Sequence, residues 1–215
     1  MADVAHTVDV AWARAWVQAS AAVVGTNRMA LNDLDRAIGD GDHGENLDRG
    51  YTAALAKLEA AETGTVGDVF ALVAKTLMST VGGAAGPLYG TAYLRAAKAA
   101  PGETVDAAGV AEVLEAALGG IVARGKAELE DKTMVDAWSP AADAAREVAT
   151  AGGSAREALT AAARAARAGA QATEPLIARK GRASYLGARS QGHRDPGAES
   201  SALLLEAAAE VAGDA

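Results

Sequence analysis

An acidic stretch punctuated by glycines carries the clearest chemistry in this sequence. It runs from Asp35 to Asn46 in the order Asp-Arg-Ala-Ile-Gly-Asp-Gly-Asp-His-Gly-Glu-Asn, so aspartates stand at positions 35, 40 and 42. So much negative charge in a tight turn is unfavourable unless a cation sits among the oxygens. Carboxylate oxygens are hard ligands and the chain has no cysteine, which indicates Mg²⁺ rather than zinc. A helix that starts after the loop would offer free N–H groups to an anion, so we expect the loop and its Mg²⁺ to bind a nucleotide polyphosphate.

Three other interpretations compete for the same loop. Residues 39–44 formally match G-x-G-x-x-G, but that dinucleotide fingerprint needs a preceding strand, and the residues before this loop have a helical pattern. A calcium EF-hand counted from Asp40 lacks both the glycine, replaced by Glu45, and the bidentate glutamate, replaced by Tyr51. We reject these two. A solvent-exposed acidic turn that caps the next helix stays open as the third alternative.

Two further segments are candidates for meeting an anion. Residues 82–87, Gly-Gly-Ala-Ala-Gly-Pro, let backbone N–H groups approach a phosphate, although a plain turn between helices has the same composition. Residues 178–194 are basic and contain no acidic residue, within a chain of formal net charge −8. That local reversal of charge favours an anionic ligand or partner, and a solvated loop is the alternative. Met134 has a side chain that can pack on a flat base, although methionine is more often a core residue.

The composition favours a helical core. Half of the 215 residues are apolar but only 4% are aromatic, so Ala, Leu and Val must build the interior. The net charge of −8 argues against nucleic acid or an anionic membrane as a partner. The N-terminus shows no signal-peptide pattern, the chain has no cysteine, and no apolar run reaches about 18 residues. We therefore expect a cytoplasmic protein without a membrane span.

Glycine and proline divide the chain into helical segments. Apolar residues recur at i, i+3 and i+4, which predicts one all-α domain over residues 1–215 with roughly eight helices. Ser154 followed by Glu157 has the spacing of a capping box, and Pro87 suits the first position of a helix. The helical segments are expected at residues 6–24, 27–37, 45–61, 66–81, 87–100, 106–129, 136–151, 154–173 and 198–212.

Several of these motifs together resemble the nucleotide-binding L subunit of the dihydroxyacetone kinase family. They occur in the order of that family from about residue 27 to the last predicted helix. The acidic loop and the block Gly-Arg-Ala-Ser-Tyr-Leu-Gly are specific when found together. The matching stretches are residues 31–35, 38–46, 82–90, 131–136, 181–187 and 192–197.

The resemblance implies an eight-helix antiparallel up-and-down barrel with a nucleotide site at one end. It implies that Asp35, Asp40 and Asp42 hold two Mg²⁺ ions that bridge the phosphates of ADP or ATP, and that Arg182 adds to the charge neutralisation during catalysis. The residues that it places around the nucleotide are His43, Gly44, Asn46, Ala84, Ala85, Gly125, Met134, Arg182, Asp195, Pro196 and Gly197. The family often has serine where this chain has Ala85, and losing that hydroxyl contact to phosphate would typically cost about 1 kcal/mol.

The resemblance also implies a function and partners. The chain would be the phosphoryl-transfer subunit of a dihydroxyacetone kinase, passing the γ-phosphate of Mg-ATP to dihydroxyacetone held on a separate K subunit. Either an M subunit of a phosphotransferase system would rephosphorylate bound ADP, or free ATP would supply the phosphate. Two alternatives stay open: an L-type subunit of a kinase for another small ketose such as erythrulose, and a regulatory ADP-binding subunit. No nucleic acid or membrane partner is expected.

Overall fold

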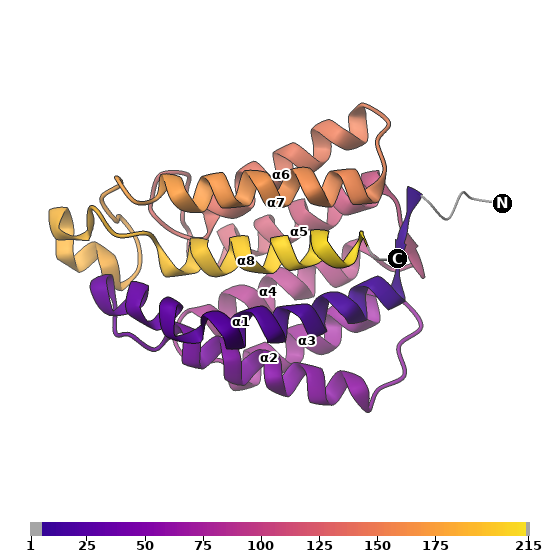
Figure 1. Cartoon of the computed structure of the whole chain (residues 1–215), viewed down its shortest axis with the longest axis horizontal. Coiled ribbons are helices and arrows are strands. Elements are labelled where there is room, and N and C mark those ends of the chain that lie inside the picture. The colour runs from indigo at the N-terminus through magenta and orange to yellow at the C-terminus, as the bar shows by residue number, and fades with distance from the viewer. Residues whose placement is uncertain (1–5, 214–215) are drawn as a thin grey trace.

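Eight long α-helices run up and down along one axis and close into a ring (Figure 1). Each helix packs against the next along the chain, and α8 returns to pack against α1, which makes an antiparallel barrel. The computed structural model describes residues 6–213, so the two extremities of the predicted domain 1–215 lie outside the described residues. The elements are β1 (Val8–Asp9), α1 (Val10–Ile38), α2 (His43–Glu59), α3 (Val66–Thr80), α4 (Ala85–Ala99), β2 (Thr104–Val105), α5 (Ala107–Gly125), α6 (Val135–Thr150), α7 (Ala155–Ala172), the 3₁₀ helix η2 (Arg182–Ser190) and α8 (Pro196–Val211).

The predicted all-α class and its alanine-rich core are confirmed. Small side chains bring the helices close together. In α7, buried residues recur at helical spacing and are nearly all alanine, from Ala155 through Ala162 to Ala170. Between α6 and α7 the backbones approach so closely that a Cβ on Gly169 would lie 2.0 Å from the carbonyl oxygen of Asp136. Such contacts favour straight, closely packed antiparallel helices.

Aromatic rings fill the barrel interior despite their low number. Trp12 and Trp16 stack with ring centroids 5.3 Å apart, and Phe70 meets Trp16 edge-on at 5.4 Å. The cavity beside the two tryptophans has a volume of about 10 Å³, which is room for about one water molecule. None of the helices between residues 6 and 213 combines the length and the apolar character that a membrane span requires.

The structure corrects several predicted boundaries. The helices expected at residues 6–24 and 27–37 are one continuous helix, α1, because Gly25 keeps helical geometry and faces α2, where its Cβ would meet Asp48 at 3.3 Å. The helix expected to reach residue 129 ends at Gly125, since Lys126 takes a left-handed φ of 55°. Pro87 is the third residue of α4 rather than the first.

Three local features complete this comparison with the sequence. The capping box of Ser154 and Glu157 at the start of α7 is confirmed. Residues 182–190, which lie outside the helical segments expected from the sequence, form the 3₁₀ helix η2, which is kinked at Gly187. A two-residue ladder between β1 and β2 was not expected, because strands this short leave no alternation in the sequence.

The loops fall into two groups because successive helices alternate in direction (Figure 1). We call the end with loops 60–65, 100–106 and 151–154 the far end, and β1 and β2 lie there too. The opposite end, here called the site end, holds loops 39–42, 81–84, 126–134 and 173–195. The motifs singled out in the sequence for binding a cation or an anion fall at the site end, where α2, α4, α6 and α8 all begin.

Candidate functional site

A pocket of about 190 Å³ opens at the site end. All four site-end loops contribute to its wall, from Gly39 in the first to Asp195 in the last. Because these loops are far apart in the sequence, the closed ring of helices is what brings them together.

Three carboxylates form the acidic side of the pocket. Asp35 belongs to the last turns of α1, and Asp40 and Asp42 follow in the loop before α2; one oxygen from each lies within 4.8 Å of the others. The Oδ2 atom of Asp35 accepts hydrogen bonds from the backbone N–H groups of Gly41 at 2.9 Å, Asp42 at 2.9 Å and His43 at 3.2 Å. Asp35 therefore shapes the loop with one oxygen and leaves Oδ1 for another contact.

Glycine creates the space that this carboxylate needs. A Cβ on Gly39 would fall 2.1 Å from Oδ1 of Asp35, so a larger residue would displace the acid. At Gly41 the backbone has a φ of 80°, a left-handed conformation that other residues rarely adopt. The donor set is made only of carboxylate oxygens and lies partly exposed, which suits a hard cation such as Mg²⁺ that keeps some of its water.

Helix N-termini bring electropositive groups to the same pocket. The N-cap residues of α2, α4 and α6 are Asp42, Ala84 and Met134, and none of them makes a side-chain capping hydrogen bond. All three line the pocket. A helix start carries a partial positive charge, so three of them around one pocket favour an anion such as a phosphate chain. Some of their first N–H groups already donate to side chains: His43 to Asp35, Glu45 to Asn32 and Val135 to Thr133.

A buried hydrogen-bond network supports the pocket from behind. His43 Nε2 lies 2.9 Å from the Ser200 hydroxyl, which lies 2.7 Å from the Tyr89 hydroxyl. Tyr89 in turn lies 2.9 Å from Ser201, which accepts a hydrogen bond from Trp138 Nε1 at 3.0 Å. Burial lowers the pKa of His43 against the opposing charges of Asp35, Asp42 and Asp40, so its neutral form is favoured. The network joins α2, α4, α6 and α8.

Arg182 stands at the rim of the pocket. Its guanidinium lies 3.1 Å from Asp40 Oδ2, and its side chain is 68% exposed, so the pair adds little to stability. Of the other basic residues between 178 and 194, Lys180 lines the pocket, whereas Arg194 turns away to pair with Glu199 of α8 at 2.7 Å. Only part of the basic segment therefore faces the site.

Asp195 closes the pocket beside α8. Its carboxylate caps that helix by accepting a hydrogen bond from the N–H of Ala198 at 2.8 Å. Burial raises the pKa of Asp195 to about 7, and the charge of Asp136 contributes, while the capping bond and Lys132 oppose the shift.

The pocket gathers most of the residues predicted from the sequence. Two predicted residues are not part of its lining: Gly44 lies under α1, where a Cβ would fall 2.1 Å from the carbonyl oxygen of Arg28, and Gly125 lies against Leu88. The predicted residues that line it are Asp35, Asp40, Asp42, His43, Asn46, Ala84, Ala85, Met134, Arg182, Asp195, Pro196 and Gly197.

Several residues that line the pocket were not predicted from the sequence, and two of them are polar and buried. Tyr89 and Lys132 both line the pocket, and both are fully buried. Tyr89 stands within a segment that resembles the family, but a tyrosine in an apolar helix gives no signal of a polar partner. Lys132 stands beside Met134, and a lysine in a loop normally indicates solvent.

The fold and the site together define a class: an all-α barrel domain with a pocket at one end that combines carboxylates with helix N-termini. The chain belongs to the DAK2 domain family, whose model matches residues 37–210. It is 46% identical over 201 residues to the PEP-dependent dihydroxyacetone kinase 1, ADP-binding subunit DhaL, of Listeria innocua, covering 94% of this chain and 96% of that protein. It is 40% identical over 192 residues to the PEP-dependent dihydroxyacetone kinase, ADP-binding subunit DhaL, of Escherichia coli, covering 89% and 91%. The predicted resemblance to the L subunit of dihydroxyacetone kinase is confirmed.

A solved structure agrees with the barrel. The dihydroxyacetone kinase from C. freundii in complex with AMP-PNP and Mg²⁺ superposes with a TM-score of 0.69 at 26% identity. The match covers 94% of this chain but only 34% of that one, so this chain spans about a third of the larger kinase. The predicted antiparallel barrel is thereby confirmed.

Proposed function

We propose that this chain is the nucleotide-binding, phosphoryl-transfer subunit of a dihydroxyacetone kinase. The observation that carries the proposal is that Asp35, Asp40 and Asp42 share one pocket with three helix starts whose N-cap side chains make no capping hydrogen bond. A pocket that combines carboxylates with electropositive helix ends fits a metal-bound polyphosphate better than a pocket with either charge alone. The names of the Listeria and E. coli relatives, both ADP-binding subunits, support this assignment.

Each part of the site has a role in this proposal. Asp35, Asp40 and Asp42 would hold two Mg²⁺ ions, which when bound supply charge neutralisation on the phosphate oxygens. Ala84 and Ala85 leave room for the N–H groups at the start of α4 to approach a phosphate, and Met134 offers an apolar surface to the base. Arg182, which pairs with Asp40, would turn to the phosphates once that carboxylate faces a cation. His43 and Asn46, at the start of α2, would line the nucleotide beside the acidic loop.

We infer that the acceptor sugar is held by a separate K subunit. No side chain of the pocket described above is an obvious nucleophile for a covalent phosphoenzyme, so direct transfer to a hydroxyl brought by the partner fits best. Both relatives are PEP-dependent kinases by name, which favours rephosphorylation of bound ADP by an M subunit of a phosphotransferase system over exchange with free ATP.

Native mass spectrometry of the purified protein tests this function. Retained ADP together with two magnesium masses is the expected result, and a bare chain that also fails to bind added Mg-ADP would contradict the proposal. An assay with the K subunit then separates the phosphate donors. Phosphorylation of dihydroxyacetone should require PEP with the M subunit and its phosphocarrier proteins, and activity with ATP alone would overturn that part.

A further inference from the structure

Lys132 holds an unusual place beneath the pocket. It stands in loop 126–134, which joins α5 to α6, and only 1% of its surface is exposed. Its backbone has a φ of 62°, a left-handed conformation that is strained for a lysine. Backbone strain of this kind persists only where surrounding contacts fix it, and it tends to occur at functional positions.

The contacts of the ammonium group are all backbone carbonyl oxygens. Lys132 Nζ lies 2.8 Å from the carbonyl oxygen of Thr173, 3.3 Å from that of Glu174, 3.1 Å from that of Leu176 and 2.5 Å from that of His193. We call these four oxygens the carbonyl cage. Three of them belong to the residues that follow α7, where a helix C-terminus leaves carbonyls unpaired and carries a partial negative charge. The fourth comes from the approach to α8.

The carbonyl cage joins the two ends of segment 173–195. The hydrogen bond from Gly192 N–H to the carbonyl oxygen of Glu174, at 2.9 Å, closes the same pair of ends. Thr173 adds a link of its own, since its hydroxyl accepts from the N–H of Asp195 at 2.9 Å. Between these ends the segment supplies Lys180, Arg182 and other residues to the pocket wall. The shape of that wall therefore depends on whatever holds the cage together.

We propose that the Lys132 ammonium is a tethered cation that holds segment 173–195 in the form required by the nucleotide pocket. Without a cation the four carbonyl oxygens would repel one another in a buried place. Those of Thr173 and Glu174 also accept from backbone N–H groups, but those of Leu176 and His193 would lose the donor that Lys132 provides. A lysine ammonium has three N–H donors for these four acceptors, whereas a free ammonium ion has four. Lys132 is thus a positioning residue, and the cage without its side chain becomes a site for a small monovalent cation.

Lys132→Ala tests this assignment because it removes the ammonium group and leaves the carbonyl cage open to a cation from solution. At a temperature where the variant is folded, we expect its Kd for Mg-ADP to rise at least tenfold and the amides of segment 173–195 to exchange hydrogen faster. Ammonium chloride should reverse both effects relative to sodium chloride at the same ionic strength. Lys132→Met keeps the volume of the stem and occupies the cage, so ammonium should not restore it.

Lys126→Ala is the matched control. Lys126 lies in the same loop with a similar left-handed φ of 55°, but its side chain is exposed. Lys126→Ala is the same substitution at a similar left-handed backbone conformation, so the Kd and the exchange rates of this variant should stay at the wild-type values. An equal effect of Lys126→Ala, wild-type behaviour of Lys132→Ala, or an equal response to ammonium and sodium would overturn the proposal.

Two further results are decisive as well. If Lys132→Ala is unfolded in sodium chloride, folding on transfer to ammonium chloride supports the cage, and failure to fold overturns it. The binding measurement depends on the proposed nucleotide site, but the exchange measurement does not. If the wild-type protein binds no Mg-ADP, the proposed function is wrong. The exchange rates of Lys132→Ala would still decide whether Lys132 positions segment 173–195.

Discussion

The two ends of the barrel start their helices in different ways. At the far end all four helices begin with a side-chain cap: Asp9 for α1, Thr65 for α3, Asp106 for α5 and Ser154 for α7. At the site end three of the four helices that begin there have no such cap, and Asp195 of α8 is the exception. The same chain thus caps every far-end helix with the side chain of its N-cap residue, and omits that cap at three of the four helix starts where an anion is expected.

Backbone strain follows the same division. Of the nine positive-φ residues described between positions 6 and 213, eight belong to the site end, and Gly152 at the far end is the ninth. The three that are not glycine, at positions 126, 130 and 132, all stand in one site-end loop. Far-end loops favour stability, whereas site-end loops hold conformations that are useful only with a ligand.

Asp42→Asn should have the largest effect on binding and almost none on folding. The side chain makes no capping bond at the start of α2, so the barrel should keep its melting temperature. Loss of one carboxylate from a site of three should weaken Mg-ADP binding on the order of 100-fold and abolish phosphoryl transfer. Calorimetric titration with Mg-ADP and the coupled assay measure both.

Asp33→Asn is the control for that change. Asp33 is an exposed residue of α1 that pairs with Arg36. Its loss should leave binding and transfer unaltered. Wild-type affinity in Asp42→Asn would show that the acidic loop is a solvated turn, the alternative that the sequence left open.

Asp195 should make stability depend on pH. An aspartate in an unfolded chain has a pKa of about 3.9, and burial raises the pKa of folded Asp195 to about 7. The folded state therefore holds the proton more tightly, so the contribution is fully present below pH about 4 and is lost as the pH rises to about 7. The slope in that window is roughly 1 kcal/mol per pH unit.

Asp195→Asn should remove this dependence while keeping the cap of α8, because asparagine is an equally good N-cap residue. Urea unfolding of the ligand-free protein at pH 5 and pH 7 gives the comparison. The wild-type protein should lose more free energy of unfolding between the two values than the variant does. Equal losses would mean that Asp195 titrates normally.

Arg182→Ala tests the rim of the pocket. A charge-assisted contact to phosphate at an exposed position should be worth about tenfold in the Kd for Mg-ADP, while the melting temperature stays unchanged. Arg189→Ala, in the same 3₁₀ helix and also exposed, should leave the Kd at its wild-type value. Unchanged retention of ADP by Arg182→Ala through purification would rule out a phosphate contact.

The contrast between the ends also explains what the sequence could reveal. Far-end features are local, so Ser154 and Glu157 identified their helix start from spacing alone. The acidic loop could also be predicted as a candidate cation site, because its three aspartates are close in the sequence. Gly25 led to a wrong helix boundary, since the sequence does not distinguish a glycine inside a long helix from one that ends a helix. Lys132 could not be found because its four partners lie more than 40 residues away, and its burial results from the closed ring of helices.

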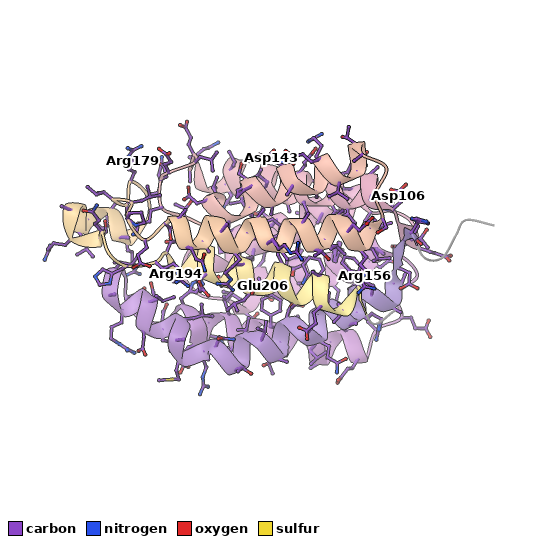
Figure 2. All side chains as sticks on the ribbon, turned by 45° about the horizontal axis from the view of Figure 1, so that its top comes forward. Asp106, Asp143, Arg156, Arg179, Arg194 and Glu206 are labelled. Carbon is purple, nitrogen blue, oxygen red and sulfur yellow. The ribbon has the colours of Figure 1, made fainter. Side chains whose placement is uncertain are left out.

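Asp106→Ala gives the smallest effect and completes the contrast. Asp106 caps α5 at the far end, opposite the site end where Arg179 lies (Figure 2), and accepts a hydrogen bond from the N–H of Gly109 at 2.8 Å. Loss of this cap should lower the free energy of unfolding by about 1 kcal/mol and leave Mg-ADP binding unchanged. Asp143→Ala, the same substitution at an exposed position within α6, should not destabilise the protein, because alanine is the better helix former. If Asp106→Ala weakened Mg-ADP binding as well, the two ends would be energetically coupled and their division of roles would fail.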